Sequence, residues 1–254
     1  MAVRIEKSGT VWTVIHDRPE ARNAMDPASA DALTAAFLEF DADKKASVAV
    51  FYGAGGAFCA GWDLKYVSTL NAEYPLGELD LLSIGTHGNG GEIPRGPLGP
   101  SRLELDKPVI AAIEGPAVAG GMELGLWCDF RVMAKDSYFG VYCRRWGVPL
   151  IDGGTVRLPR IVGQGRALEI ILTGRKVPAG ECLAIGLCEF VTPNERAREK
   201  AEELAQQIAR FPQVCVRADR RSAIRSQGLS VRDALIQEWY NGREALVKDG
   251  VAGA

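Results

Sequence analysis

Two glycine-rich segments carry residue types that could stabilise negative charge on a substrate. They are GAGGAFCAGWDLK, from Gly53 to Lys65, and EGPAVAGGMELG, from Glu114 to Gly125. Each follows a short apolar run and leads into helical spacing, so each should present free backbone N–H groups at a helix start. Two such groups directed at one carbonyl oxygen would stabilise an enolate or tetrahedral oxyanion, typically by about 3 to 4 kcal/mol per donor. Either segment alone could be an ordinary turn, but the pair predicts one oxyanion-binding site.

The elements around these segments alternate between strand and helix. Apolar runs predict strands from Val48 to Tyr52, from Val109 to Ile113 and from Phe130 to Ala134. Helical spacing follows the second strand, from about Gly121 to Trp127. This order is typical of an α/β fold with crossover helices.

The N-terminal region supplies a hairpin and a helix. The apolar segments Val3 to Glu6 and Val11 to His16 are separated by a Ser-Gly turn signal, which predicts a hairpin. Asp26 then offers an N-cap and Pro27 a first helical residue, so a helix should begin there.

The composition excludes several partners. The chain has 254 residues, of which 47% are hydrophobic, enough for a large buried core. Its 30 basic and 32 acidic residues form no long basic block, so we expect no nucleic-acid partner. No N-terminal secretory signal and no apolar run of roughly 18 to 20 residues is present, so we expect no membrane span and a cytoplasmic location.

Common catalytic motifs are missing. The six cysteines form no CxxC pair, so we expect reduced thiols, and the two histidines are too few for a histidine-rich metal site. We therefore expect no metal. The sequence also lacks a GxSxG elbow and a GxxxxGK[ST] phosphate loop, and GAGGAF fails the GxGxxG pattern at its last position.

Two segments are expected to frame the core. Between Gly85 and Pro100 lie six glycines and three prolines, too many for a regular element, so this stretch is either a lid or a surface insertion. From about Glu195 onward the pattern becomes nearly continuous helix. Apolar faces on these helices would need covering by the core or by a neighbouring subunit.

The chain resembles the crotonase, or enoyl-CoA hydratase/isomerase, superfamily over nearly its whole length. The resemblance implies a spiral of repeated ββα units over residues 1–194 and a helical region over residues 195–254 that builds a trimer or a dimer of trimers and helps cover the ligand. It also implies a coenzyme A thioester as substrate, with no separate cofactor. It rests on RPEARNAM, GAFCAGWDLK, KPVIAAIEGPAVAGGMELGLWCDFRVMA, DGGTVRLPRIVG and ALEIILTGRKVPAGECLAIGLCEFV.

The same resemblance assigns residues to ligand binding. It places the two oxyanion N–H groups on Trp62 and Gly120, in the segments that the residues themselves suggest. Gly120 also fits on physical grounds, because a residue without a Cβ tolerates the closest approach of a ligand. Arg22 could bind phosphate or be an ordinary surface charge. The further residues implied for coenzyme A and substrate are Arg22, Ala24, Ala60, Asp63, Leu64, Gly121 and Cys143.

The groups that would transfer protons depart from the hydratase pattern. Glu123 lies between Met122 and Leu124, where burial would raise its pKa. It matches one of the two catalytic glutamates of the hydratases. The alternative is an exposed glutamate at a helix start. A count without gaps places Cys143 where the second glutamate would be. A thiol is a poor substitute for a carboxylate in activating water.

Asp152 could compensate for the missing glutamate. Some isomerases and carbon-carbon hydrolases of the superfamily carry an acid/base aspartate at the position of Asp152. Asp152 could instead be an N-cap for the following helix. The nearby Arg144 and Arg145 could pair with it, hold a substrate carboxylate or contact another subunit.

The sequence thus predicts acyl-CoA chemistry through a stabilised enolate, with Glu123 and Asp152 transferring protons. The resemblance favours hydration of a trans-2-enoyl-CoA to a 3-hydroxyacyl-CoA. The alternatives are an enoyl- or dienoyl-CoA isomerase or a β-diketone hydrolase that uses Asp152, and a non-catalytic acyl-CoA-binding relative.

Overall fold

A six-stranded sheet forms the centre of the protein. The computed structural model describes residues 2–81 and 93–250. The sheet has the order β1-β2-β3-β4-β6-β9, and every pair is parallel except the hairpin β1–β2. The predicted hairpin and the three predicted internal strands are confirmed. The strands are β1 (Val3–Ser8), β2 (Val11–His16), β3 (Val48–Gly53), β4 (Val109–Ile113), β6 (Phe130–Ala134) and β9 (Phe190–Thr192).

A second, three-stranded sheet turns the chain into a spiral. β5 (Pro116–Val118) pairs with β7 (Tyr138–Gly140), which pairs with β8 (Lys176–Pro178). The chain passes from β4 to β5 and from β6 to β7, so consecutive turns lie next to each other in both sheets. Cys59 forms a parallel bridge with Ala117 and extends this second layer to the turn that follows β3. The predicted spiral of ββα units is confirmed.

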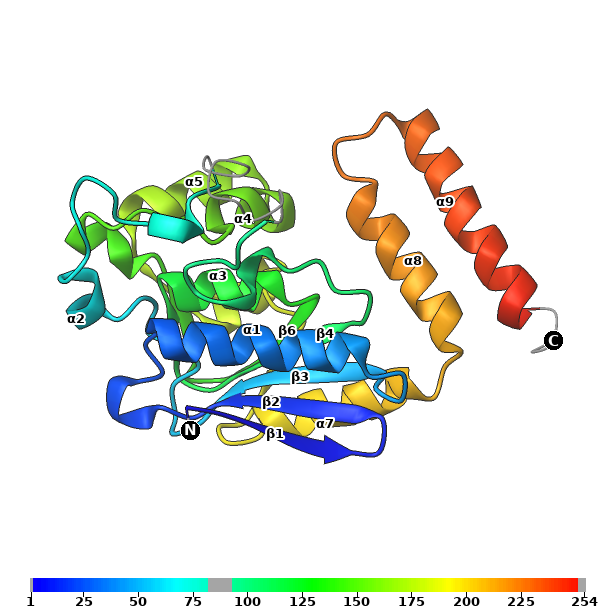
Figure 1. Cartoon of the computed structure of the whole chain (residues 1–254), viewed down its shortest axis with the longest axis horizontal. Helices are drawn as coiled ribbons and strands as arrows, with labels where there is room; N and C mark the ends of the chain where they lie inside the picture. Colours follow the sequence, from blue (N-terminus) through cyan, green and yellow to red (C-terminus); the bar gives the residue numbers. More distant parts are fainter. Residues whose placement is uncertain (1, 82–92, 251–254) are drawn as a thin grey trace.

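Helices cover both faces of the large sheet (Figure 1). α1 (Pro27–Ala42) begins where predicted, because the Asp26 carboxylate accepts a hydrogen bond of 2.8 Å from the backbone N–H of Ser29. α1 and α3 (Gly120–Trp127) pack on one face with the larger apolar core. The other described helices of the core are α2 (Leu64–Val67), α4 (Gly154–Val162), α5 (Gln164–Thr173), α6 (Ala179–Ala184) and α7 (Ala197–Ala209).

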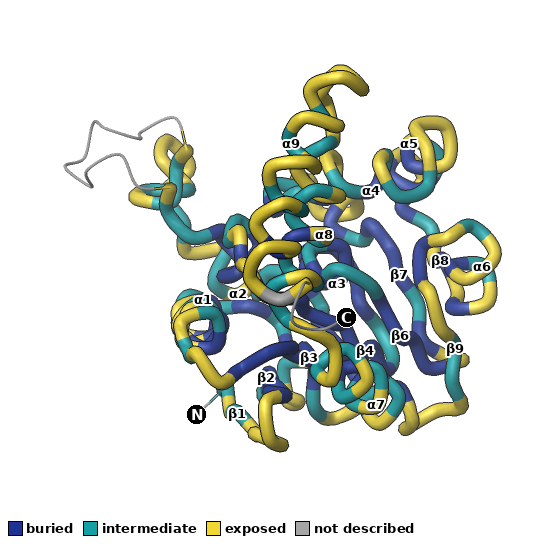
Figure 2. The backbone as a smooth tube through the Cα atoms, turned by 90° about the vertical axis from the view of Figure 1, so that its right-hand side faces the viewer, coloured by how far each residue is buried: buried dark blue, intermediate teal, exposed yellow. Residues whose placement is uncertain are grey.

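The C-terminal helices differ from the predicted division at residue 195. α7 belongs to the core, because Ala197, Ala201 and Ala205 are buried against the second face of the sheet. The hairpin of α8 (Gln213–Arg225) and α9 (Val231–Ala245) extends away from it, and α9 is largely exposed (Figure 2). A periodic helical pattern alone does not distinguish a helix that covers a sheet from one that projects.

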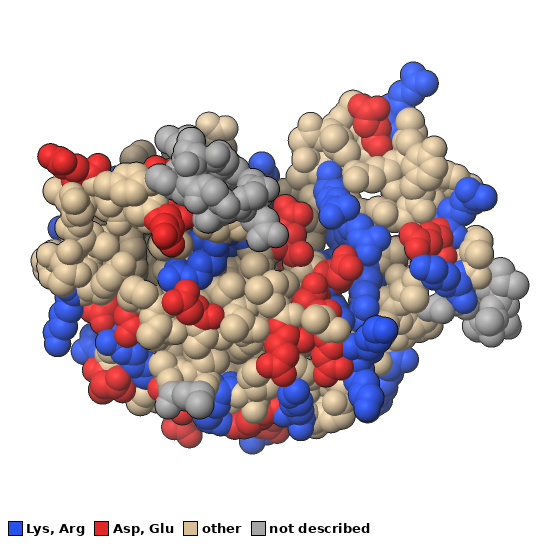
Figure 3. All heavy atoms as spheres, viewed as in Figure 1, with Lys and Arg blue, Asp and Glu red and all other residues tan. Residues whose placement is uncertain are grey.

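Ion pairs join α8 to the core across a partly open boundary. Arg220 contacts Asp129 at 2.8 Å and Arg221 contacts Asp106 at 3.2 Å. Basic and acidic side chains are interspersed on this face of the molecule (Figure 3). A cavity of about 670 Å³ still separates the hairpin from the core. No helix in the described ranges is both long and apolar enough to cross a bilayer.

The glycine- and proline-rich stretch is described only in its second half. Residues 85–92 of the predicted lid or insertion lie outside the described residues. Gly96 and Gly99 exchange two backbone hydrogen bonds, of 3.0 and 2.9 Å, and form a tight turn. A short 3-10 helix, η4 (Pro100–Arg102), follows this turn and packs against α1 and α3.

His16, at the end of β2, makes the stability of the fold depend on pH. Its ring is fully buried, and neither ring nitrogen has a hydrogen-bond partner among the described residues. Burial lowers the pKa of His16 to about 4, whereas an unfolded histidine titrates near about 6.5. Between about pH 6.5 and pH 4, protons therefore bind His16 in the unfolded chain but not in the folded one. The free energy of unfolding is not reduced by this effect above pH 6.5, and it falls as the pH falls towards 4.

We expect the free energy of unfolding to fall between pH 7 and pH 5 by about 2 kcal/mol more in the wild type than in His16→Phe. Phenylalanine fills a similar volume and cannot be protonated. Urea unfolding at the two pH values measures the difference. An equal pH dependence in both proteins would show that His16 is not the responsible group.

Candidate active site

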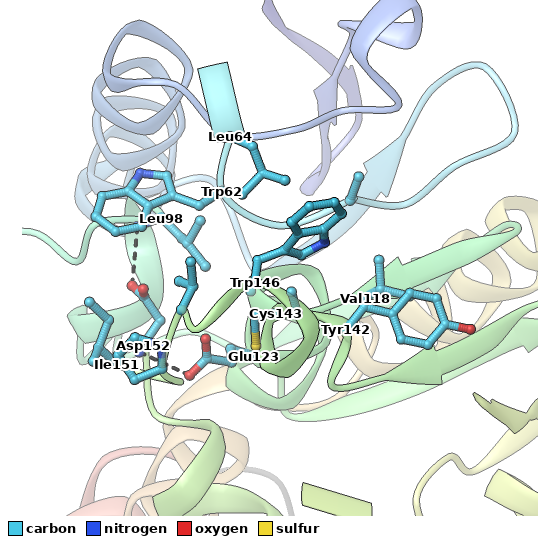
Figure 4. A pocket seen from close by; sticks show the side chains of 15 residues that line it. Trp62, Leu64, Leu98, Val118, Glu123, Tyr142, Cys143, Trp146, Ile151 and Asp152 are labelled. Atoms are coloured by element: carbon cyan, nitrogen blue, oxygen red, sulfur yellow. Dashed lines mark hydrogen bonds between the residues drawn. The ribbon is translucent and has the colours of Figure 1, made fainter. Parts of the chain in front are cut away.

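A cavity of about 180 Å³ lies where the two glycine-rich segments meet (Figure 4). Its wall is mostly apolar, and it also carries the carboxyl groups of Glu123 and Asp152 and the thiol of Cys143. The segments reach it from two consecutive turns of the spiral. The predicted site residues on its wall are Ala60, Trp62, Leu64, Gly120, Glu123, Cys143 and Asp152.

Backbone contacts bring the two glycine-rich segments together. The N–H of Val118 donates to the carbonyl of Cys59 at 3.0 Å, which ties the first segment to β5. Gly61 then approaches so closely that a Cβ on it would lie 3.1 Å from the amide nitrogen of Gly120. The residue that follows Gly61 is Trp62, so both predicted oxyanion donors lie at one point of contact.

The two predicted oxyanion N–H groups have no acceptor among the described residues. Among the described residues, neither the N–H of Trp62 nor that of Gly120 donates a hydrogen bond. Gly120 is the first residue of α3, where the geometry of a helix leaves the N–H without an internal partner. The preceding Ala119 has φ = 53°, a conformation that is unfavourable for a residue with a Cβ. A sharp turn thus directs the start of α3 towards the cavity.

Glu123 is buried beside the oxyanion donors. Its side chain lies one turn into α3, and the residue is only 2% exposed, so it is not the exposed helix-start glutamate of the alternative interpretation. Oε1 accepts hydrogen bonds from the N–H groups of Asp152, at 2.9 Å, and Gly154, at 2.8 Å. Burial and the neighbouring charge of Asp152 raise the pKa of Glu123 to about 8.

Asp152 presents a second carboxyl group to the same cavity. Its Oδ1 accepts hydrogen bonds from the Leu98 N–H, at 3.1 Å, and from the Ser101 hydroxyl. Burial raises the pKa of Asp152, against the lowering effect of these bonds. The N-cap interpretation of Asp152 is wrong, because Gly153 is the cap residue of α4 and it is the Glu123 carboxylate that binds the first N–H of that helix.

Cys143 lies on the other side of Glu123 from Asp152 (Figure 4). Burial and the charge of Glu123 raise the pKa of the Cys143 thiol, so it remains protonated and is a weak acid-base partner. Arg144 and Arg145 do not line the cavity: the first donates to the carbonyl of Ile171, and the second lies 4.0 Å from the centre of the Tyr142 ring. The described contacts include no ion pair between either arginine and Asp152.

Comparisons with known proteins agree with this geometry. A profile of the family "Enoyl-CoA hydratase/isomerase" matches residues 6–80 and 101–237. The chain belongs to the enoyl-CoA hydratase/isomerase family. It is 32% identical over 252 residues to the enoyl-CoA hydratase EchA19 of Mycobacterium tuberculosis, covering 96% of this chain and 88% of that protein. It is 34% identical over 220 residues to the carnitinyl-CoA dehydratase of Salmonella typhi, covering 85% and 78%.

Solved structures of the family share the whole fold. The enoyl-CoA hydratase of Bacillus anthracis superposes with a TM-score of 0.86 at 31% identity, covering all of this chain and 94% of that one. An enoyl-CoA hydratase of Mycobacterium tuberculosis also gives a TM-score of 0.86 at 31% identity, covering 98% and 91%. The chain is therefore an enzyme with acyl-CoA chemistry of the enoyl-CoA hydratase type.

Other residues that the family resemblance assigns to coenzyme A lie away from the cavity wall. The carbonyl of Arg22 accepts the N–H of Ala60 at 3.0 Å, and that of Ala24 accepts a hydrogen bond from Arg18. Asp63 forms an ion pair of 2.8 Å with Arg18. Gly121 is buried behind the cavity, where a Cβ would lie 2.0 Å from the carbonyl oxygen of Cys59. Roles for these residues in binding coenzyme A stay predictions.

Three residues that hold Asp152 in place have no signal in the sequence. Leu98 and Ser101 bind the Asp152 carboxylate from a turn about fifty positions earlier in the chain. Arg157, in α4, donates to the main-chain carbonyls of Asp152, at 3.0 Å, and Ser101, at 2.8 Å. No local spacing connects these positions, and only the spiral brings them together. The described residues contain no cluster of side chains suited to a metal ion.

Proposed function

We propose that the protein catalyses the reversible hydration of a trans-2-enoyl-CoA to a 3-hydroxyacyl-CoA. The observation that carries the proposal is a second carboxyl group, that of Asp152, in the same cavity as Glu123 and the two free N–H groups. Asp152 thereby supplies the second carboxyl group in place of the glutamate whose position Cys143 occupies. The names of two relatives, a hydratase and a dehydratase of CoA thioesters, describe the addition or removal of water.

The two carboxyl groups differ in a way that suits proton transfer. Oε1 of Glu123 accepts two backbone hydrogen bonds, which leaves Oε2 to carry a proton, and the raised pKa keeps that proton near neutral pH. Asp152 accepts two hydrogen bonds at Oδ1 and lies near the positive charges of Arg102 and Arg157, which stabilise its ionised form. The pair then holds one proton, because two ionised carboxylates in an apolar cavity repel each other.

The proposed reaction uses this asymmetry. Asp152 accepts a proton from water while the water oxygen forms a bond to C3 of the enoyl group, and the electrons of the double bond move into a thioester enolate. The N–H groups of Trp62 and Gly120 stabilise the enolate oxygen. Glu123 then donates its proton to C2, and a proton passes from Asp152 back to Glu123 after product release. Coenzyme A enters as part of the substrate, and the reaction needs no separate cofactor.

The cavity favours an uncharged acyl group. Away from the reacting carboxyl groups its wall is formed by side chains such as Trp62, Leu98, Trp146, Pro149 and Ile151. A charged acyl chain would lose its hydration in this cavity without gaining a paired charge.

Ultraviolet absorbance tests the proposal directly. Purified protein should remove the conjugated enoyl absorbance of short and medium trans-2-enoyl-CoA and form the 3-hydroxyacyl product. If the enoyl absorbance stays constant with every chain length, the protein is not a hydratase of these thioesters. In that case, turnover of a 3-enoyl-CoA or of a β-diketone would identify an isomerase or a hydrolase that uses Asp152. Tight binding without any reaction, measured by calorimetry, would identify a non-catalytic relative.

We also propose that the chain forms a trimer or a dimer of trimers through its C-terminal helices. α9 exposes an apolar stripe of Val231, Leu235 and Trp239, which are 78%, 58% and 66% exposed. An exposed stripe of this kind is typical of a contact surface.

We expect sedimentation velocity to give three or six times the chain mass of 27.3 kDa. We also expect the double variant Leu235→Lys/Trp239→Lys to sediment as a monomer, because two charges would be buried in the contact. Lys44→Glu, which changes an exposed charge in the turn between α1 and β3, is the control. A wild-type monomer, or a variant that assembles normally, would contradict the proposal.

A further inference from the structure

The carboxylate of Asp152 is held by residues that precede it by 51 and 54 positions in the chain. The hydroxyl of Ser101 and the N–H of Leu98 both donate to Oδ1. No donor among the described residues contacts Oδ2. The carboxylate is thus fixed by one oxygen, and its other oxygen is free to accept a proton.

Ser101 occupies a closely packed environment. It is only 1% exposed. A Cβ on Gly96 would lie 1.9 Å from the Ser101 hydroxyl oxygen and 2.5 Å from Oδ1 of Asp152, so the bare main chain of Gly96 packs directly on this hydrogen bond. The turn between Gly96 and Gly99 therefore keeps water away from the bonded oxygen and leaves the serine hydroxyl as its side-chain donor.

Arg157 fixes the distance between the two partners. Its guanidinium group donates to the carbonyls of both Ser101 and Asp152, at 2.8 and 3.0 Å, and so joins the two main chains. Gly153 leaves room for this contact, because a Cβ there would lie 2.0 Å from Nη1 of Arg157. The hydroxyl and the carboxylate are thus held in one relative position by an independent set of bonds.

We infer that Ser101 is a positioning residue for the reaction, whose hydroxyl holds the Asp152 carboxylate in the orientation that proton transfer from water requires. The inference rests on the proposed function. Without the hydroxyl, the Leu98 N–H would be the single bond to Oδ1 among the described contacts, and one bond does not fix rotation of the carboxylate. The charged form of Asp152 would also lose a hydrogen bond, which raises its pKa.

Ser101→Ala tests the inference. We expect kcat to fall roughly 10- to 100-fold, in line with the loss of a hydrogen bond to a charged group, while KM changes less than about twofold. The acidic limb of the kcat/KM profile should move to higher pH, because the base must be ionised. Among the described residues, the other charged groups that face Asp152 are Glu123 on α3, Arg157 on α4 and Arg102 on η4, and all remain in this variant.

Matched variants separate positioning from folding. Ser101→Thr keeps the hydroxyl and should retain the wild-type pH profile, whereas its additional methyl group in this closely packed site should lower the free energy of unfolding. Ser137→Ala removes another buried hydroxyl, which donates to the carbonyl of Ile113 at 2.9 Å outside the cavity. Ser137→Ala should lower the free energy of unfolding and leave kcat and the pH profile unchanged. A wild-type pH profile in Ser101→Ala, or an equal loss of kcat in Ser137→Ala, would overturn the inference.

A second measurement keeps the inference separate from the proposed function. If the wild type hydrates no thioester, the proposed function fails, but the carboxyl carbon of Asp152 can still be titrated by NMR after carbon-13 labelling of aspartate. Its signal is identified by its loss in Asp152→Asn. A higher pKa in Ser101→Ala than in the wild type would support the assigned contact, and an unchanged pKa would overturn it.

Discussion

Replacing Glu123 by glutamine should reduce kcat by about 10² to 10⁴-fold, the range typical of a lost general acid. The side-chain oxygen of glutamine can accept the same hydrogen bonds from the N–H groups of Asp152 and Gly154, so the start of α4 should be retained. The amide carries no proton that could be transferred to C2. Steady-state kinetics with a trans-2-enoyl-CoA measures the loss, and calorimetry should show that thioester binding remains.

Glu114 provides a matched control for that variant. It is also a buried glutamate that binds a helix start, since its carboxylate accepts the N–H groups of Glu195, at 3.1 Å, and Ala197, at 2.9 Å, beside α7. Glu114 does not line the cavity. Glu114→Gln should therefore leave kcat near the wild-type value. A Glu123→Gln enzyme with more than a tenth of wild-type kcat would show that Glu123 is not the proton donor.

Local sequence signals predicted the elements that position the site. The strands β4 and β6 begin and end at the predicted residues, because runs of mainly apolar residues, interrupted in β6 by Arg131, are typical of parallel strands buried on both faces. The cap of α1 was equally local, since Asp26 and Pro27 act on the first turn of the same helix. The two glycine-rich segments were also recognisable, because each follows an apolar strand and joins a turn to a helix start.

The partners of the acidic side chains could not be predicted in the same way. Asp152 stands close to the start of α4, separated from it by Gly153, and that local position suggested an N-cap. In the folded chain, Leu98 and Ser101 reach its carboxylate from another turn of the spiral, and Glu123 from α3 binds the start of α4 instead. Helix capping is a local interaction, so a contact from a distant segment can replace it without changing the nearby sequence.

The C-terminal region shows a similar limit. Amphipathic spacing predicted helices beyond residue 195, and α7, α8 and α9 are present. Alanine at positions 201 and 205 fits α7 closely against the sheet, whereas α9 carries large apolar residues on an exposed face. Periodicity gives the apolar face of a helix, but the surface that covers that face depends on the tertiary and quaternary structure.

Asp152→Asn should also reduce kcat by about 10² to 10⁴-fold, because an amide cannot accept the proton of the attacking water. Its side-chain oxygen can still accept hydrogen bonds from the Leu98 N–H and the Ser101 hydroxyl, so the variant should fold. The acidic limb of the kcat/KM profile that reports ionised Asp152 should disappear. Kinetics measured from pH 5 to pH 9 tests both effects.

Asp129→Asn is the corresponding control. The Asp129 carboxylate binds the Val109 N–H and Arg220, each at 2.8 Å, outside the cavity that contains Asp152. Its loss should lower stability while leaving the pH profile of kcat/KM unchanged. Wild-type turnover in Asp152→Asn would return Asp152 to a structural role, and it would also exclude an isomerase or a hydrolase that uses Asp152 as its base.

Combining Glu123→Gln with Asp152→Asn distinguishes one coupled pair from two independent groups. The Asp152 N–H donates directly to Glu123, and the charge of Asp152 raises the pKa of Glu123, so the two should hold a single proton as a unit. When two catalytic residues act as a unit, removing the second reduces kcat only slightly once the first has been removed. We therefore expect the double variant to be about as slow as the slower single variant. If the two losses multiply instead, each carboxyl group contributes to the rate without the other, and the shared proton on which the proposed hydration depends does not exist.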